Sequence, residues 1–127
     1  MKRMYGMGLA GIKIPAHETA ILEGTAQIAF TPERIACANA TPFDLLRIEC
    51  RSMKDPSEDD GCIFKSAAKS DPKFAGYPLE LAILDPPLLA LLRTIAVLPG
   101  QDIRFFLRNR TGRAEWAQCT VLGCTTE

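Results

Sequence analysis

Apolar and polar residues alternate most regularly near the C-terminal end of the chain. Over Asp102–Asn109 every second residue is apolar, which is the period of a strand with one face in a core and the other in water. The following Ala114–Gly123 predicts a returning strand in which Trp116 points inward, and Arg110–Arg113 predicts the hairpin turn between the two strands. The inward residues of the first strand are Ile103, Phe105 and Leu107.

Four segments nearer the N-terminus also have the composition of strands. They are Thr19–Phe30, Arg34–Ala38, Phe43–Arg51 and Cys62–Phe64. Thr31–Glu33 contains a proline and predicts the turn between the first two of these strands. In the third strand, the residues expected on one face are Leu46, Ile48 and Cys50.

The segment Leu79–Leu98 carries signals of both helix and strand. Asp85 precedes two prolines and a run of leucines, an arrangement typical of a helix N-terminus. Beyond Arg93, β-branched residues favour a strand. We therefore expect a short turn or helix over Asp85–Ala90 and a strand over Leu91–Leu98.

Short strands separated by turns rich in proline and glycine favour an all-β fold over an α/β fold. We predict a single antiparallel β-sandwich, jelly-roll-like, over residues 12–127, with one short helix. Residues 1–11 include three glycines and predict a flexible N-terminal arm that orders by lying on a neighbouring chain. Met53–Pro78 is the longest irregular stretch, and connections of this length are usually interaction loops.

Composition and charge narrow the classes of function. With 127 residues, 47% of them apolar, the chain is long enough to bury a core without a metal or a disulfide. Its 15 basic and 15 acidic residues give zero formal net charge, which argues against an electrostatic grip on nucleic acid or anionic membrane. The longest apolar run, Pro86–Leu92, is too short to span a bilayer. We expect no nucleic-acid partner, no membrane partner and synthesis in the cytoplasm.

The chain has five cysteines, an odd number, and none of them is spaced like a zinc site or a thioredoxin motif. Reduced, buried thiols are the expected state. The alternative is disulfide formation after release from the cell, within or between subunits, and the spacing leaves the pairing open. The cysteines are Cys37, Cys50, Cys62, Cys119 and Cys124.

No catalytic constellation can be assembled from the pattern. The only histidine, His17, lies beside Pro15 in an expected loop and has no activated nucleophile near it in the sequence. The acidic cluster Ser57–Gly61 lacks the ligand spacing of a calcium loop, so a solvated loop is expected there rather than a cation site. We predict no catalytic residue, no cofactor and no metal.

Arginines gather in the C-terminal segment, whereas acids dominate between Asp55 and Asp85. Arginine beside aromatic residues suits either a surface that stacks bases or a protein interface. The aromatic residues at inward positions favour the protein interface, and the uneven charge would orient the chain beside a copy of itself. The interface residues expected on this basis are Arg104, Arg108, Arg110, Arg113, Asp59 and Asp60.

Several turns and strand starts follow one another in a recognisable order. They are Ile14-Pro15-Ala16, Thr31-Pro32-Glu33-Arg34-Ile35, Phe43–Ile48, Pro99–Ile103 and Asn109–Gly123. In this order the chain resembles a group of small β-sandwich proteins encoded by phages and regarded as virion components. The resemblance spans roughly residues 12–123, and its motifs are turn residues. It implies a jelly-roll-like sandwich and a role in building or decorating a capsid, and it carries over no catalytic residue.

These observations predict a non-enzymatic structural subunit of a bacteriophage virion, as a head decoration or minor capsid protein. Its expected partners are further copies of itself, with a trimer favoured, and the major capsid protein. An alternative is a tail- or fibre-associated binding module that recognises a host-surface ligand through the Met53–Pro78 loop. An enzyme built on His17 is a third reading, and loss of turnover on changing that residue would support it.

Overall fold

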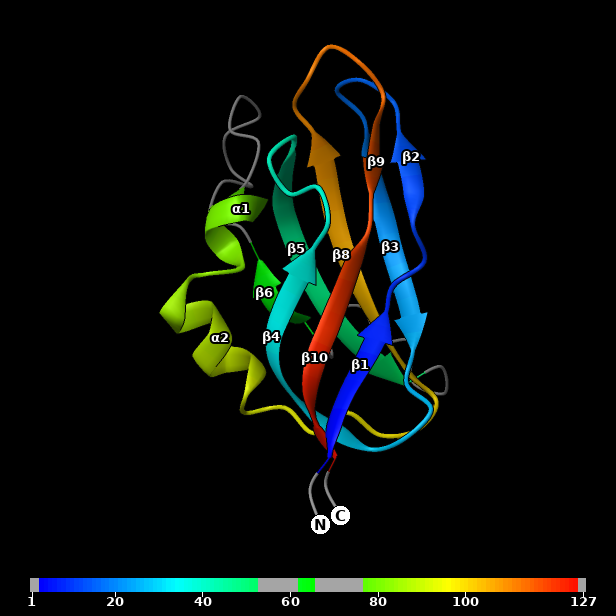
Figure 1. Cartoon of the computed structure of the whole chain (residues 1–127), viewed down its shortest axis with the longest axis vertical. Coiled ribbons are helices and arrows are strands. Elements are labelled where there is room, and N and C mark those ends of the chain that lie inside the picture. Colours follow the sequence, from blue (N-terminus) through cyan, green and yellow to red (C-terminus); the bar gives the residue numbers. More distant parts are fainter. Residues whose placement is uncertain (1–2, 53–61, 66–76, 126–127) are drawn as a thin grey trace.

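The computed structural model describes residues 3–52, 62–65 and 77–125, and strands account for much of them (Figure 1). The predicted all-β fold with a short helix is confirmed. Two short helices, α1 (Leu79–Ala82) and α2 (Pro86–Leu92), follow one another between β7 and β8. The strands are β1 (Met4–Gly8), β2 (Ile12–Ile14), β3 (Thr19–Thr25), β4 (Phe30–Cys37), β5 (Phe43–Ser52), β6 (Cys62–Lys65), β7 (Tyr77–Pro78), β8 (Gln101–Asn109), β9 (Glu115–Ala117) and β10 (Cys119–Thr125).

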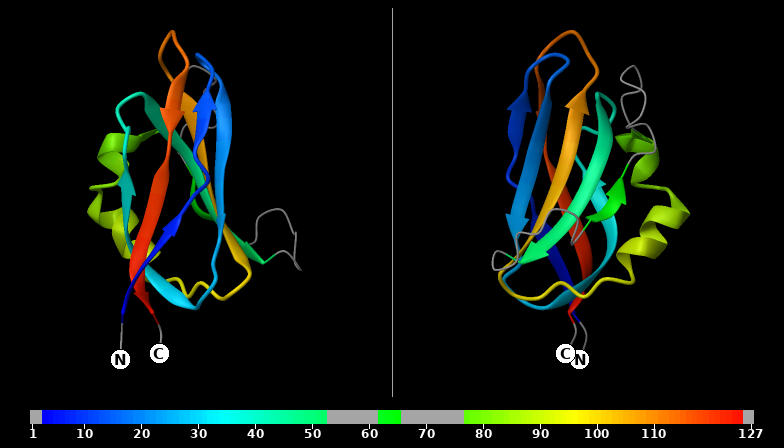
Figure 2. Two further views of the ribbon diagram at one scale, coloured as in Figure 1. Left: turned by 45° about the vertical axis from the view of Figure 1, so that its right-hand side comes forward. Right: turned by 180° about the vertical axis from the view of Figure 1, so that it is seen from behind.

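The strands form antiparallel sheets that face each other as a sandwich (Figure 2). One sheet has the order β1-β10-β4, and the other has the order β3-β8-β5-β6, with β7 also paired to β5. A short pair, β2 and β9, lies at the end of the sandwich opposite the two termini (Figure 1). The loops at that end therefore come from widely separated parts of the sequence.

The core lies between the two sheets and is filled by alternate residues of their strands. Phe105 and Leu107 of β8 are buried, as their alternation predicts, and they are joined by Leu22 of β3 and Phe30 of β4. Burial of side chains of this size contributes roughly 1.5–3 kcal/mol each. The core therefore stabilises both sheets against each other.

The predicted helix is confirmed over α2, which packs with α1 beside β4, β5 and β6 on the outside of the sandwich (Figure 2). The Asp85 carboxylate accepts a hydrogen bond from the backbone N–H of Leu88 at 3.2 Å, and proline takes the first helical position. Leu88 and Leu92 point into the core one turn apart.

The strand expected over Leu91–Leu98 is wrong. The helix runs on to Leu92, and of the later residues only Val97 pairs, in an isolated bridge with Phe30. Leu92 is buried one helical turn after Leu88, and this burial outweighs the preference for a strand of the β-branched residues that follow.

The flexible arm expected over residues 1–11 is wrong for its described part. Strand β1 pairs in register with β10, and Met7 and Leu9 are buried in the core. The backbone N–H of Leu9 then donates to the Cys119 carbonyl at 2.9 Å, and that of Ala10 donates to the Glu23 carbonyl at 2.9 Å. The segment thus links both sheets instead of extending toward a neighbour.

The turn expected over Thr31–Glu33 is also wrong, because these residues lie inside β4. Pro32 is tolerated there because β4 is an edge strand of its sheet, where the missing N–H breaks no ladder on the open side. A bulge in β4 lies at this point: Leu122 of β10 is opposite Arg34 and Gly123 is opposite Pro32, so Glu33 is the extra residue.

The hairpin expected around Arg110–Arg113 is not one. Strand β8 pairs with β3 and β5, whereas β9 pairs with β2, so the connection crosses from one sheet to the other. In this arrangement Trp116 is 51% exposed, which contradicts its expected inward position. In β5 a bulge at Leu46 shifts the alternation, so that Phe43 and Leu45 are buried before it and Ile48 after it.

Candidate functional site

The four arginines expected at an interface do not form one patch. Arg104 lies on the outer face of β8 and pairs with the Glu23 carboxylate of β3. Arg108 lies on the same face of β8, four residues further along the strand. Arg110 and Arg113 lie in the connection that crosses between the sheets. The acids expected to complement them, Asp59 and Asp60, lie outside the described residues.

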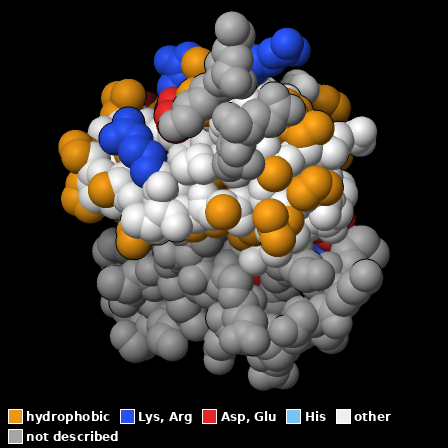
Figure 3. Space-filling view, turned by 90° about the horizontal axis from the view of Figure 1, so that it is seen from below, with side chains coloured by type: hydrophobic (Ala, Val, Ile, Leu, Met, Phe, Trp, Pro, Cys, Tyr) orange, Lys and Arg blue, Asp and Glu red, His pale blue; other side chains and the backbone are white. Residues whose placement is uncertain are grey.

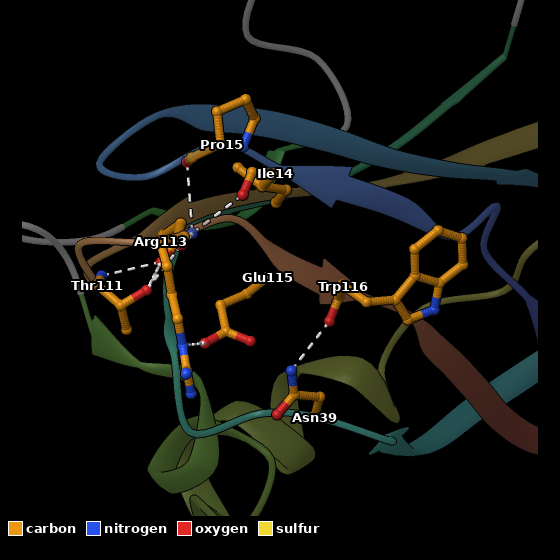
Figure 4. Close-up of polar contacts among 8 residues, drawn as sticks. Ile14, Pro15, Asn39, Thr111, Arg113, Glu115 and Trp116 are labelled. Carbon is orange, nitrogen blue, oxygen red and sulfur yellow. Dashed lines mark hydrogen bonds and ion pairs between the residues drawn. The ribbon is translucent and has the colours of Figure 1, made fainter.

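Three of these arginines have carboxylate partners within the chain. Arg113 donates to Glu115 at 3.0 Å, with the Arg113 side chain 84% exposed (Figure 4). Arg110 donates to Asp44 at 3.0 Å and to the Thr41 carbonyl at 2.5 Å. An exposed pair such as Arg113–Glu115 contributes at most about 1 kcal/mol, and each of these pairs reduces the positive charge offered to an outside anion. Three of the four arginines are therefore already paired with acids of the same chain.

Arg110 forms the centre of a small cluster that joins three elements. Its guanidinium also lies 3.5 Å from Glu80 of α1, while Asp44 belongs to β5. Burial raises the pKa of the Asp44 carboxyl above its ordinary value, and the charges of Arg110 and Arg108 oppose that rise. The folded chain therefore holds this proton more firmly than the unfolded chain, so the contribution of Asp44 to stability falls as the pH rises through its folded pKa.

Replacement of Arg110 by glutamine is expected to raise the pKa of Asp44 further, because the opposing charge and hydrogen bond are lost while the burial remains. The measurement is an NMR titration of the side-chain carboxyl carbon in both proteins. Arg113→Gln is the matched control, since Arg113 pairs with Glu115 and not with Asp44. An unchanged or lowered Asp44 pKa in the Arg110 variant would contradict this account.

A buried asparagine holds the loops at the end opposite the termini. Asn109 is fully buried, and its side-chain NH₂ donates toward the carbonyls of Ile14 at 3.0 Å, Pro15 at 3.3 Å and Arg113 at 2.7 Å. Its Oδ1 accepts from the backbone N–H of Thr111 at 2.9 Å and from the Thr111 hydroxyl at 2.7 Å. One side chain thus fixes the β2–β3 turn and the β8–β9 connection together.

Sequence reasoning missed this role of Asn109. An asparagine at the end of an alternating strand is an ordinary turn residue, and its polarity argues against burial. Its position two residues after the inward Leu107, on the same face of β8, is the one signal of its burial.

The loops that Asn109 fixes present an exposed tryptophan. The Trp116 indole lies on β9 and points away from the polar contacts around Arg113 (Figure 4). A Cβ atom at Gly11 would lie 2.7 Å from the indole carbon Cζ2, so the ring packs directly over that glycine. The Asn39 side chain donates to the backbone carbonyl of Trp116 at 3.1 Å. The ring therefore packs on Gly11 and is about half exposed to solvent.

The outer face of α2 is apolar. The helix reads Pro-Pro-Leu-Leu-Ala-Leu-Leu and contains no polar side chain. Leu88 and Leu92 face the core, whereas Leu91 and the preceding Leu84 are exposed, the latter by 72%. We call the exposed residues Leu81, Leu84, Pro87, Ala90 and Leu91 the helical surface.

The acidic side chains beside the helical surface are engaged within the chain. Glu80 contacts Arg110 at 3.5 Å, and the Asp85 carboxylate caps α2. Further apolar side chains are spread over the described part of the end that carries the termini (Figure 3). Soluble monomers rarely leave contiguous apolar surface uncovered. The helical surface is therefore an exposed apolar region next to acidic side chains that already have partners within the chain.

The remaining candidates for chemistry stay separate. His17 is exposed in the β2–β3 turn with a φ of 61°, a left-handed conformation. The Ser57–Gly61 cluster lies outside the described residues, as does the Met53–Pro78 loop except for residues 62–65, 77 and 78. Within residues 3–52, 62–65 and 77–125, no group of histidine, cysteine or acidic side chains could hold a metal ion. No described helix is long and apolar enough to cross a membrane.

Comparison with known proteins identifies no relative of this chain. No family model matches the chain, and neither the curated proteins nor the solved structures contain a significant match.

Proposed function

We propose that this chain is a non-enzymatic structural subunit that packs against other protein chains through the helical surface. The observation that carries the proposal is α2 itself, a helix that is apolar all round although only one side of it faces the core. A helix of this composition is normally buried on every side. Covering its outer face with a second protein chain would satisfy that expectation.

The assembly that we propose is a bacteriophage particle, in which this chain decorates the head or forms a minor part of the shell. The support is the order of turn and strand motifs from Ile14 to Gly123 and the β-sandwich that they occupy. Self-association, with a trimer favoured, and packing on the major capsid protein belong to the same proposal.

The first test is the effect of charge on the helical surface. Leu84→Glu and Leu91→Glu are expected to raise the dissociation constant of the self-associated form at least about tenfold, because each places a carboxylate in an apolar contact. Sedimentation velocity over a range of concentrations measures the association. Ile28→Glu is the control, since Ile28 is exposed about as much as Leu91 but lies in the β3–β4 connection.

The outcomes of this test are distinct. Loss of association in both helical variants, with Ile28→Glu unchanged, supports the helical surface as the contact. A wild-type chain that stays monomeric and binds no phage particle would contradict the proposal that it is a structural subunit. Peptide mass spectrometry of purified particles then tests the virion: fixed stoichiometry with the shell protein supports a capsid component, and absence of the chain overturns it.

A second candidate function is recognition of a host-surface ligand, and the exposed indole of Trp116 favours it. An aromatic ring held rigidly at a loop end contacts other molecules at low cost in conformational entropy. Binding on a glycan array that is lost in Trp116→Ala would support this function. Equal binding by the variant, or no binding by the wild type, would remove it.

A further inference from the structure

Two of the five cysteines face each other across neighbouring strands. Cys37 ends β4 and Cys119 begins β10, and the two residues are direct partners in the register of the sheet. Their Sγ atoms lie 2.6 Å apart. This distance is well inside the ~3.5–4.0 Å at which non-bonded heavy atoms usually rest.

The backbone geometry at this pair suits a covalent bond. The Cys119 carbonyl accepts a hydrogen bond from the N–H of Leu9, which follows β1 on the side of β10 away from β4. In the neighbouring residue pair, the N–H of Ala38 donates to the carbonyl of Gln118. Cys37 and Cys119 therefore form a non-hydrogen-bonded pair, in which opposed Cα atoms lie about 4.5 Å apart and the side chains are closest. That separation falls within the range that disulfides span.

We propose that Cys37 and Cys119 form a cross-strand disulfide when the folded chain meets a low-molecular-weight disulfide such as oxidised glutathione. The half-buried Cys37 is the accessible member, whereas Cys119 is 1% exposed. The Cys37 thiolate attacks one sulfur of the glutathione disulfide, which releases one glutathione and leaves a mixed disulfide. The Cys119 thiolate then attacks the Cys37 sulfur and releases the second glutathione.

This order of events follows from the surroundings of the two thiols. The contact with Cys37 and, after it, burial raise the pKa of the Cys119 thiol, which makes it a poor first nucleophile but leaves it in place for the second step. Cys50, in the other sheet, is also a weak competitor, because burial raises the pKa of its thiol to about 11. The disulfide would join β4 to the last strand and close a chain segment of 82 residues.

The test is oxidation of the reduced, folded full-length chain with oxidised glutathione, followed by trypsin digestion without reductant and mass spectrometry. The expected product links the peptide 35–47, whose one cysteine is Cys37, to the peptide 114–127. Because the second peptide also contains Cys124, fragmentation between Cys119 and Cys124 assigns the bond. The melting temperature should rise by about 10–15 °C and return after reduction.

Variants separate this bond from the alternatives. Cys124→Ser should keep both the linked peptide and the rise in melting temperature, whereas Cys119→Ala should lose both. If Cys119→Ala does not fold, Cys37→Ser at the half-buried position provides the same test. A folded chain that keeps five free thiols, stops at a glutathione adduct on Cys37 or links Cys37 to another cysteine would overturn the inference. This outcome does not depend on the helical surface.

Discussion

Replacement of Asn109 by aspartate is expected to lower the free energy of unfolding by about 3–5 kcal/mol. The carboxylate would place a buried negative charge against the carbonyls of Ile14 and Arg113, where the native NH₂ donates. The carbonyls of Ile14 and Arg113 would lose the Asn109 donor, while that of Pro15 keeps the backbone N–H of Glu18, and each unsatisfied buried group costs roughly 1–3 kcal/mol. Urea denaturation followed by circular dichroism measures the change.

Asn39→Asp is the matched control for this prediction. The Asn39 side chain makes one exposed hydrogen bond, to the carbonyl of Trp116, in the same group of loops. Its replacement should therefore cost no more than about 1 kcal/mol. Similar losses in the two variants would show that Asn109 does not hold the loops in the way described.

Replacement of Gly123 by alanine is expected to destabilise the fold by at least about 3 kcal/mol, or to prevent folding. A Cβ atom at this position would lie 2.0 Å from the Thr31 carbonyl oxygen and 2.9 Å from the Pro32 Cα. Both neighbours are backbone atoms of β4, so relief of the clash requires the two strands to separate at the bulge. Thermal unfolding of the purified variant, or its recovery as soluble protein, measures the effect.

Gly112→Ala provides the comparison, because a Cβ atom there meets nothing within 4 Å and the position has no positive φ. Alanine lowers the conformational entropy of the unfolded chain, so the free energy of unfolding should stay unchanged or rise by less than about 1 kcal/mol. A Gly123 variant as stable as the Gly112 variant would mean that β4 and β10 do not approach as closely as described.

The parts of the fold that could be predicted from sequence are those with a local signal. Alternation in β8 identified its buried residues, and an aspartate before two prolines identified the start of α2. The β5 prediction failed at Leu46, because a bulge inserts one residue into the pattern and moves the following side chains to the opposite faces. No local signal in the sequence marks that insertion.

The arm and the hairpin failed for a different reason, which is pairing between distant segments. Gly6 and Gly8 favour flexibility, but β1 is ordered by its ladder with β10, more than a hundred residues away. Likewise, Arg110–Arg113 resembles a tight turn, and only the pairing of β9 with β2 sends the chain into the other sheet. Pairing between segments that lie so far apart in the chain gives no signal in a short stretch of sequence.

The expected interface depended on the same distant contacts. The arginines were correctly placed on outward positions of β8 and in the following connection, but their partners Glu23, Asp44 and Glu80 come from three other elements. Counting charges along the chain could not show that these acids already pair with them. The apolar α2, by contrast, was visible in the sequence, although it was read only as a helix or turn.

Both ends of the described chain leave the sandwich together. The Thr125 N–H donates to the Arg3 carbonyl at 2.8 Å, at the end away from Trp116 (Figure 1). A fluorescent or affinity tag fused to either end would therefore emerge from one point and leave the loop end unobstructed. Two copies could also be joined head to tail by a linker of a few residues, giving a tethered pair whose tryptophan-bearing ends remain free to engage a common target.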